Sequence, residues 1–265
     1  MKRAWLTPTT IVGLLGVYGV LYLWQPDGAE VLLVVTHVLF AACALLASIL
    51  ALKASGIFEP GVASRRVWLA FGAGMTALTI SEMLWIVYYV VGQPIPYPSI
   101  VDVSWGIGFI SVLASLVLQY RALDVQISRR RKLLVLAAYL GVLLVFLGLL
   151  IGHILANPGE VAVMQLLISA YYLIGDLGVA FLATLTLVYF GKGLVGRPWR
   201  YLLSSILLFA VGGLAFSYGT WTNAYVTGSN FLSGVADVGY LSAYMLAAAG
   251  GYIQLTLRLP SVDEE

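Results

Sequence analysis

The chain contains eight long apolar stretches, and these limit its possible fold more than any other feature. An α-helix needs about 20 apolar residues to cross the hydrocarbon core of a bilayer, and most of the stretches reach that length. Because the chain is 61% hydrophobic and 10% charged, no soluble fold could hide its apolar surface. We therefore predict an all-α integral membrane protein whose main partner is the lipid bilayer. The predicted transmembrane helices are Thr9–Trp24, Glu30–Leu52, Arg66–Val91, Ser99–Tyr120, Leu133–Ile154, Val161–Phe190, Tyr201–Thr222 and Leu232–Leu257.

Every connection between these predicted helices is short, so none has room for a soluble catalytic or binding domain. A functional site must then lie within the membrane or at its edge. The start of the chain, Met1–Arg3 followed by an apolar run, also has features of a signal peptide. No small-residue cleavage site precedes Gln25, so we expect the first helix to be retained.

The positive charges are confined to alternate connections, which predicts how the helices cross the membrane. All 14 lysines and arginines lie at the chain ends or in the connections after the second, fourth and sixth predicted helices. The other connections carry only Asp27, Glu30 and Glu160 as charged residues. Since connections rich in lysine and arginine stay in the cytoplasm, both termini are predicted to be cytoplasmic. We expect a multi-pass protein of the cell (plasma) membrane, whose basic cluster at 129–132 orients the chain and binds no nucleic acid.

An internal repeat relates the two halves of the chain. Asp102 matches Asp237 at a separation of 135 residues, and Trp105 matches Tyr240 at the same separation. A fixed separation kept over such a length is typical of repeated structural units. Four pairs just upstream are each separated by 136 residues: Ser81/Ser217, Trp85/Trp221, Tyr89/Tyr225 and Gly92/Gly228.

The repeat predicts four segments: a first four-helix repeat at 1–122, a basic cytoplasmic linker at 123–132, a second four-helix repeat at 133–258 and an acidic cytoplasmic tail at 259–265. Each half contains an even number of helices, so the halves run parallel and are related by an axis along the membrane normal. Transporters with broken helices commonly have inverted repeats, and this chain lacks that signature.

Four acidic residues fall inside the predicted helices, apart from Glu30 at the start of the second. Glu82 lies in the outer half of the third helix, Asp102 and Asp237 at the outer ends of the fourth and eighth, and Asp176 near the middle of the sixth. An acidic side chain at the centre of a membrane helix costs about 2.5–3.5 kcal/mol, so such residues usually face the protein interior. No lysine or arginine shares their depth, so each acid must be protonated, hydrated, hydrogen-bonded or bound to a cation. Helix capping could explain Asp102 and Asp237, but not Glu82 or Asp176.

Aromatic residues cluster on the same outer side as these acids. They could form the aromatic belt common at membrane interfaces, or they could line a pocket. Tyr218 occupies the repeat position of Glu82, so the two halves place different polar groups at equivalent points. The candidate ligand-binding or polar-network residues are therefore Glu82, Asp102, Asp176, Asp237, Tyr218, Trp85, Trp221 and Tyr97.

Nothing in the sequence indicates a cofactor, a metal site or a catalytic residue. Cys43 is the only cysteine, which excludes a disulfide framework and a Cys-based metal motif. His37 and His153 are the only histidines, and a haem between them is geometrically conceivable. No redox motif accompanies them, so we interpret both as hydrogen-bonded packing residues. Every lysine lies at a predicted cytoplasmic boundary, which leaves none to form a retinal Schiff base.

Two segments resemble motifs of a known group of proteins. Residues 96–102 (PYPSIVD) resemble a P-x-P-S-x-A-D-x-x-Y loop-to-helix entry, echoed by residues 235–240 (VADVGY), and residues 172–177 (YLIGDL) resemble a Y-P-L-G-D-L segment. Both motifs are common in the multi-helix membrane sensor regions of prokaryotic diguanylate cyclases, phosphodiesterases and histidine kinases. The resemblance implies a sensor architecture over most of the chain. Since residues 260–265 hold no output domain, we expect such a sensor to signal through a separate protein.

Three functions follow from these features. The first is a stand-alone membrane sensor that binds a small or lipidic ligand in an outer-leaflet cavity and signals to a membrane or cytoplasmic partner. The second is an integral subunit of a larger membrane complex. The third is an ion- or proton-coupled transporter using Glu82 and Asp176, although the cytoplasmic half lacks the buried acids that a path across the membrane would need. An enzyme is the least favoured, because no nucleophile–base pair or metal-ligand set appears at helical spacing.

Overall fold

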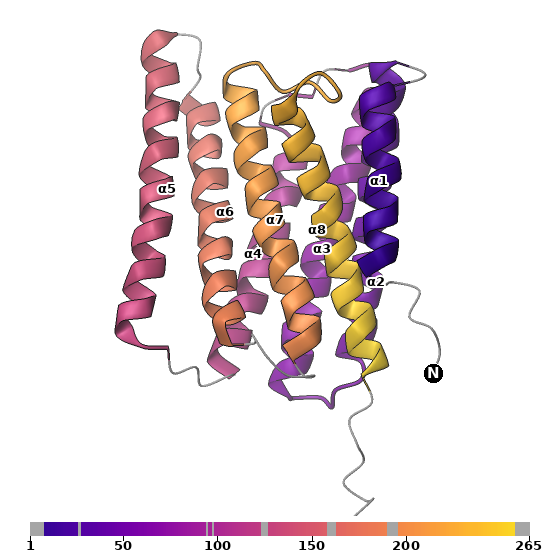
Figure 1. Ribbon diagram of the computed structural model, residues 1–265, viewed down its shortest axis with the longest axis vertical. Coiled ribbons are helices and arrows are strands. Elements are labelled where there is room, and N and C mark those ends of the chain that lie inside the picture. The colour runs from indigo at the N-terminus through magenta and orange to yellow at the C-terminus, as the bar shows by residue number, and fades with distance from the viewer. Residues whose placement is uncertain are drawn as a thin grey trace, which may run out of the picture.

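The computed structural model describes residues 8–25, 28–93, 95–96, 98–122, 127–157, 163–189 and 196–257. These residues form eight α-helices and no strand, as Figure 1 shows. The helices are α1 (Pro8–Trp24), α2 (Ala29–Ser55), α3 (Ala63–Val90), α4 (Ile100–Ala122), α5 (Arg129–Ala156), α6 (Val163–Tyr189), α7 (Gly196–Trp221) and α8 (Phe231–Thr256).

The helices confirm the prediction of a multi-span helical membrane protein. Seven of them are long and apolar enough to cross a bilayer, and α1 is a shorter apolar helix of 17 residues. Two helices begin well before their predicted starts, α5 at Arg129 and α7 at Gly196. The predictions followed apolar character alone, whereas a helix can continue past the hydrocarbon core where long basic side chains reach water. Pro198 is compatible with the α7 extension because it lies in the first turn, where no backbone N–H is needed.

Six of the helices form a closed ring. Each packs on the next in the order α2, α3, α4, α6, α7, α8, and α8 returns to α2. The other two lie outside this ring: α1 packs on α8, and α5 packs on α6 and α7, as the opposite edges of Figure 1 show. Many apolar side chains of α5 are exposed, which suits a helix that faces lipid.

Small residues allow α8 to pack closely on its two neighbours. A Cβ added to Gly239 would lie 3.3 Å from the Cα of Gly212 on α7. A Cβ added to Gly251 would lie 3.1 Å from the backbone of Leu50 on α2. Glycine at such crossings lets helix backbones approach closely, which is a main source of helix association in membranes. The residues of α8 that face α2 and α7 are therefore fully enclosed, including Ala243, Tyr244 and Ala247.

The two ends of the bundle differ in charge. Every lysine and arginine in the described part of the chain lies near the end where α1 begins and α8 finishes, which we call the basic end. The connections from α1 to α2, α3 to α4 and α7 to α8 lie at the other end (Figure 1). We call this the cavity end, because residues of the α3–α4 and α7–α8 connections line a cavity there.

Candidate functional site

A cavity of about 230 Å³ lies inside the ring, toward the cavity end. All six ring helices contribute side chains to it, together with the α3–α4 connection and Tyr225 from the α7–α8 connection. Pockets for drug-sized ligands measure about 300–1,000 Å³, so this cavity suits a smaller molecule.

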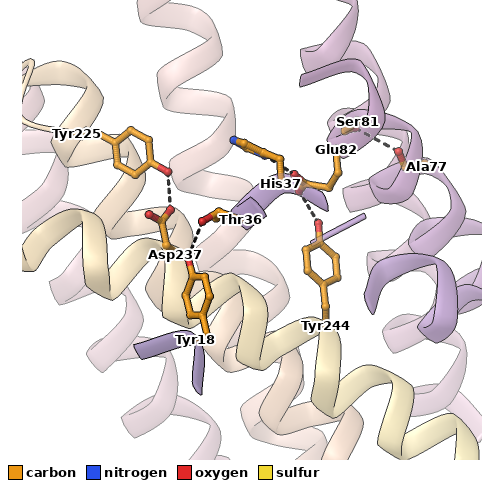
Figure 2. A network of polar contacts seen from close by, with 9 residues as sticks. All are labelled: Tyr18, Thr36, His37, Ala77, Ser81, Glu82, Tyr225, Asp237 and Tyr244. Carbon is orange, nitrogen blue, oxygen red and sulfur yellow. Dashed lines mark hydrogen bonds and ion pairs between the residues drawn. The ribbon is translucent and has the colours of Figure 1, made fainter. Parts of the chain in front are cut away.

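Glu82 on α3 forms one polar cluster at the cavity. The residue is 2% exposed, and its two carboxyl oxygens have separate partners. His37 Nδ1 on α2 lies 3.0 Å from Oε2, and the hydroxyl of Tyr244 on α8 donates to Oε1 at 2.8 Å (Figure 2). The His37 ring stacks on Trp85, with centroids 5.1 Å apart and planes within 7°. Glu82 thus links α2, α3 and α8 beside the cavity.

Asp237 on α8 forms a second cluster next to the first. Its side chain is fully buried and accepts the hydroxyl of Tyr22 on α1 at 3.0 Å. It also accepts the hydroxyl of Tyr225 at 2.5 Å (Figure 2). Burial, with the neighbouring Asp237, raises the pKa of Tyr225 well above its ordinary value, so this hydroxyl remains a donor. The capping explanation fails for Asp237, because Asn230 caps α8 by accepting from the backbone N–H of Ser233 at 2.9 Å.

Asp102 does cap its helix, as one of the two sequence interpretations predicts. Its Oδ2 accepts the backbone N–H of Ser99 at 2.6 Å, and the Ser99 hydroxyl accepts the backbone N–H of Val101 at 3.2 Å. This reciprocal pattern resembles a capping box at the start of α4. Oδ1 accepts the hydroxyl of Tyr172 on α6 at 2.7 Å, so Asp102 also joins α4 to α6 across the cavity wall.

Asp176 differs from the other three acids. It lies at the middle of α6, lines the cavity and is 2% exposed. Within the part of the chain that the structure describes, its carboxyl group accepts no hydrogen bond. It lies directly against Gly213 on α7, where an added Cβ would be 2.7 Å from the carboxyl carbon. The acid is therefore enclosed by protein and faces the cavity with its hydrogen-bonding capacity unused.

The remaining cavity wall is largely aromatic. Trp105 on α4 lies 5.7 Å from Tyr240 on α8 between ring centroids, and Phe109 lies 6.1 Å from Tyr172. Among the described residues that line the cavity there is no lysine or arginine. The aromatic lining residues are Phe40, Trp85, Trp105, Phe109, Tyr172, Phe216, Trp221, Tyr225 and Tyr240.

The structure brings most of the predicted site residues together. Asp237 reaches the cavity through its hydrogen bond with Tyr225. Tyr218 does not join the site, since it packs with the apolar cluster around Leu150 and Leu173 on α5 and α6. Tyr97 lies outside the described residues. The predicted site residues that line the cavity directly are Glu82, Asp102, Asp176, Trp85 and Trp221.

Sequence reasoning missed several partners of these acids. His37 is hydrogen-bonded, as predicted, but the sequence did not identify Glu82 as its partner. Tyr240 and Tyr244 lie three and seven residues after Asp237, which places all three on one face of α8. That helical spacing is the sequence signal from which Tyr240 and Tyr244 could have been predicted as residues of the site. His153 lies on the peripheral α5, where Asn157 contacts its ring at 3.3 Å.

The cavity combines carboxyl groups, tyrosine hydroxyls and aromatic faces, which are groups that bind small molecules. The described residues contain no cluster of three or more histidine, cysteine, aspartate or glutamate side chains able to hold a metal ion. Comparisons with protein-family models, with curated proteins and with solved structures gave no match to this chain.

Proposed function

We propose that this protein is a membrane sensor that binds a small molecule in the cavity and signals to a separate protein. The observation that carries the proposal concerns Asp176. Its buried carboxyl group faces the cavity inside the ring of helices and has no hydrogen-bond partner in the described chain. Buried polar groups in folded proteins are almost always paired, so a ligand is the natural partner for this one.

The position of the cavity suits a sensor. A ligand there contacts all six ring helices at once, near the hydrogen bonds that link α2, α3 and α8 through Glu82 and α4 to α6 through Asp102. A ligand that favours one arrangement of these helices shifts their packing toward it. The same helices continue to the basic end, where a partner would detect the shift.

The packing of the helices supports two parallel four-helix repeats. In this repeat α2 corresponds to α6, α3 to α7 and α4 to α8. The contacts of α2 with α3 and of α3 with α4 then match those of α6 with α7 and of α7 with α8. The contact of α2 with α8 likewise matches that of α6 with α4. Two repeat pairs, Trp85/Trp221 and Trp105/Tyr240, both line the cavity. The peripheral helices depart from this symmetry, since α1 packs on α8 whereas α5 packs on α6 and α7. The proposed topology places the basic end in the cytoplasm of a prokaryotic cell.

Transport is less well supported. A transporter needs a polar route from the cavity to the basic end. Large apolar side chains fill the ring on that side, among them Trp68, Phe71 and Leu203, each no more than 1% exposed. No specific contact favours the role of a complex subunit over that of a sensor.

The proposal is tested by purifying the protein in mild detergent and identifying co-purifying small molecules by native mass spectrometry. We expect one defined small molecule, whose addition raises the unfolding temperature of the stripped protein. A ligand at about 100 times its Kd would add about 2.7 kcal/mol of stability. Tyr218→Phe, at a side chain that does not line the cavity, should leave this effect unchanged. A protein that contains no small molecule, and that no fraction of a metabolite extract stabilises, would contradict the proposal.

A further inference from the structure

The carboxyl groups that line the cavity differ in whether the protein already supplies their hydrogen-bond partners. Glu82 is held by His37 and Tyr244, and Asp102 by Ser99 and Tyr172. Asp176 has no such partner among the described residues, although its side chain is 98% removed from solvent. Leaving a buried polar group unpaired is unfavourable, so the free energy available from a hydrogen-bond donor is greatest at this position.

The charges around the cavity indicate what kind of donor fits there. The described lining residues include three acids, Glu82, Asp102 and Asp176, and His37 is the one basic side chain among them. His37 already pairs with Glu82. An anionic ligand would add a further acid to this group, whereas any organic cation supplies the opposite charge and a protonated amine also supplies the hydrogen-bond donors that Asp176 lacks.

The walls of the cavity favour an organic cation over a metal ion. The three lining acids come from α3, α4 and α6, and no metal-binding cluster is present in the described ranges. Trp85, Trp105 and Trp221 line the same cavity as the acids. Tryptophan is the aromatic side chain that attracts cations most strongly, and aromatic cages are the usual binding sites for quaternary ammonium groups.

From these features we infer that the ligand is a small organic cation, an amine or quaternary ammonium compound, whose positive group lies between Asp176 and the tryptophans of the cavity. This inference rests on the proposed ligand-binding function and adds the chemical class. The size of the cavity limits the ligand to a small compound of this class.

The test compares compounds of equal shape and different charge. Choline and its neutral isostere 3,3-dimethylbutanol are titrated into the purified full-length protein, together with ethanolamine, tetramethylammonium and the anion 3,3-dimethylbutyrate. Binding is measured by calorimetry and by the shift in unfolding temperature. We expect at least one cation to bind about tenfold or more tightly than the neutral and anionic compounds.

Two variants then locate the binding site. Asp176→Asn should weaken cation binding by about tenfold or more, because it removes the negative charge with little change in shape. Tyr218→Phe, at a side chain that does not line the cavity, should have no effect. If Asp176→Asn does not fold, Trp221→Leu provides the second variant, and the comparison of isosteres on the unaltered protein already decides the charge preference.

The outcomes separate the two proposals. Equal or tighter binding of the neutral or anionic compounds would overturn the organic-cation inference and leave the ligand-binding function standing. Cation binding that Asp176→Asn does not weaken would overturn the assignment of Asp176. If no compound of any charge binds and the purified protein carries no small molecule, both proposals fail.

Discussion

Asp176 on α6 lies against the backbone of Gly213 on α7, so closely that an added Cβ at residue 213 would be 2.7 Å from the carboxyl carbon. The smallest residue of one helix thus makes room for the buried acid of the next. This contact is part of the packing between α6 and α7, and both residues line the cavity.

Gly213→Ala is expected to destabilise the protein by about 1–3 kcal/mol, because the new methyl group must displace the Asp176 carboxyl group or separate the helices. Thermal unfolding in detergent measures the change. Gly178→Ala on α6 is the matched control, since no atom lies within 4 Å of its added Cβ, and it should be neutral or stabilising. Asp176→Ala should relieve part of the Gly213→Ala defect. Equal stability of the two glycine variants would show that the close contact is absent.

Glu82 and Tyr244 are expected to be energetically coupled, because the tyrosine hydroxyl donates to a carboxylate that is 2% exposed. A double-mutant cycle with Glu82→Gln and Tyr244→Phe should give a coupling free energy of about 0.5–3 kcal/mol. Chemical denaturation in detergent provides the four stabilities. The control cycle replaces Tyr244→Phe by Tyr89→Phe, an exposed residue of α3, and should be additive. Additivity in both cycles would exclude the hydrogen bond.

Tyr22 is expected to hold α1 on the bundle, since it donates to the buried Asp237 and α1 packs on α8. Tyr22→Phe leaves one carboxylate oxygen of Asp237 without that donor, which should cost about 1–3 kcal/mol. Amide hydrogen exchange should become faster in α1 and stay unchanged in α4. Leu23→Ala, at a side chain 88% exposed, is the control and should alter neither quantity. Unchanged exchange in the Tyr22→Phe protein would contradict this prediction.

The proposed topology predicts which connections are accessible from outside the cell. Cys43 is the only cysteine, so Cys43→Ser gives a background that a maleimide should not label. In that background, Gln93→Cys in the α3–α4 connection should react with a membrane-impermeant maleimide on intact cells. Glu59→Cys in the α2–α3 connection should react only after the membrane is permeabilised. The reverse pattern would place the basic end outside.

The sequence alone determined the number of helices and the apolar part of each one, because the bilayer imposes a length and an apolar composition on each segment separately. It did not give the full extent of α5 and α7, which begin before their apolar parts. It also identified Glu82 and Asp176 as interior residues, since a charged group facing lipid is too costly. It could not place Tyr218, which faces α5 although its repeat partner Glu82 faces the cavity.

Only the tertiary structure decided how each helix is rotated about its axis, and therefore which side chains meet. Lipid tails and the protein interior are both apolar, so hydropathy does not distinguish the two faces of a membrane helix. Rotation depends instead on close contacts such as Gly239 with Gly212 and Asp176 with Gly213. These contacts join residues far apart in the chain. They bring His37 to Glu82 and leave Asp176 facing the cavity.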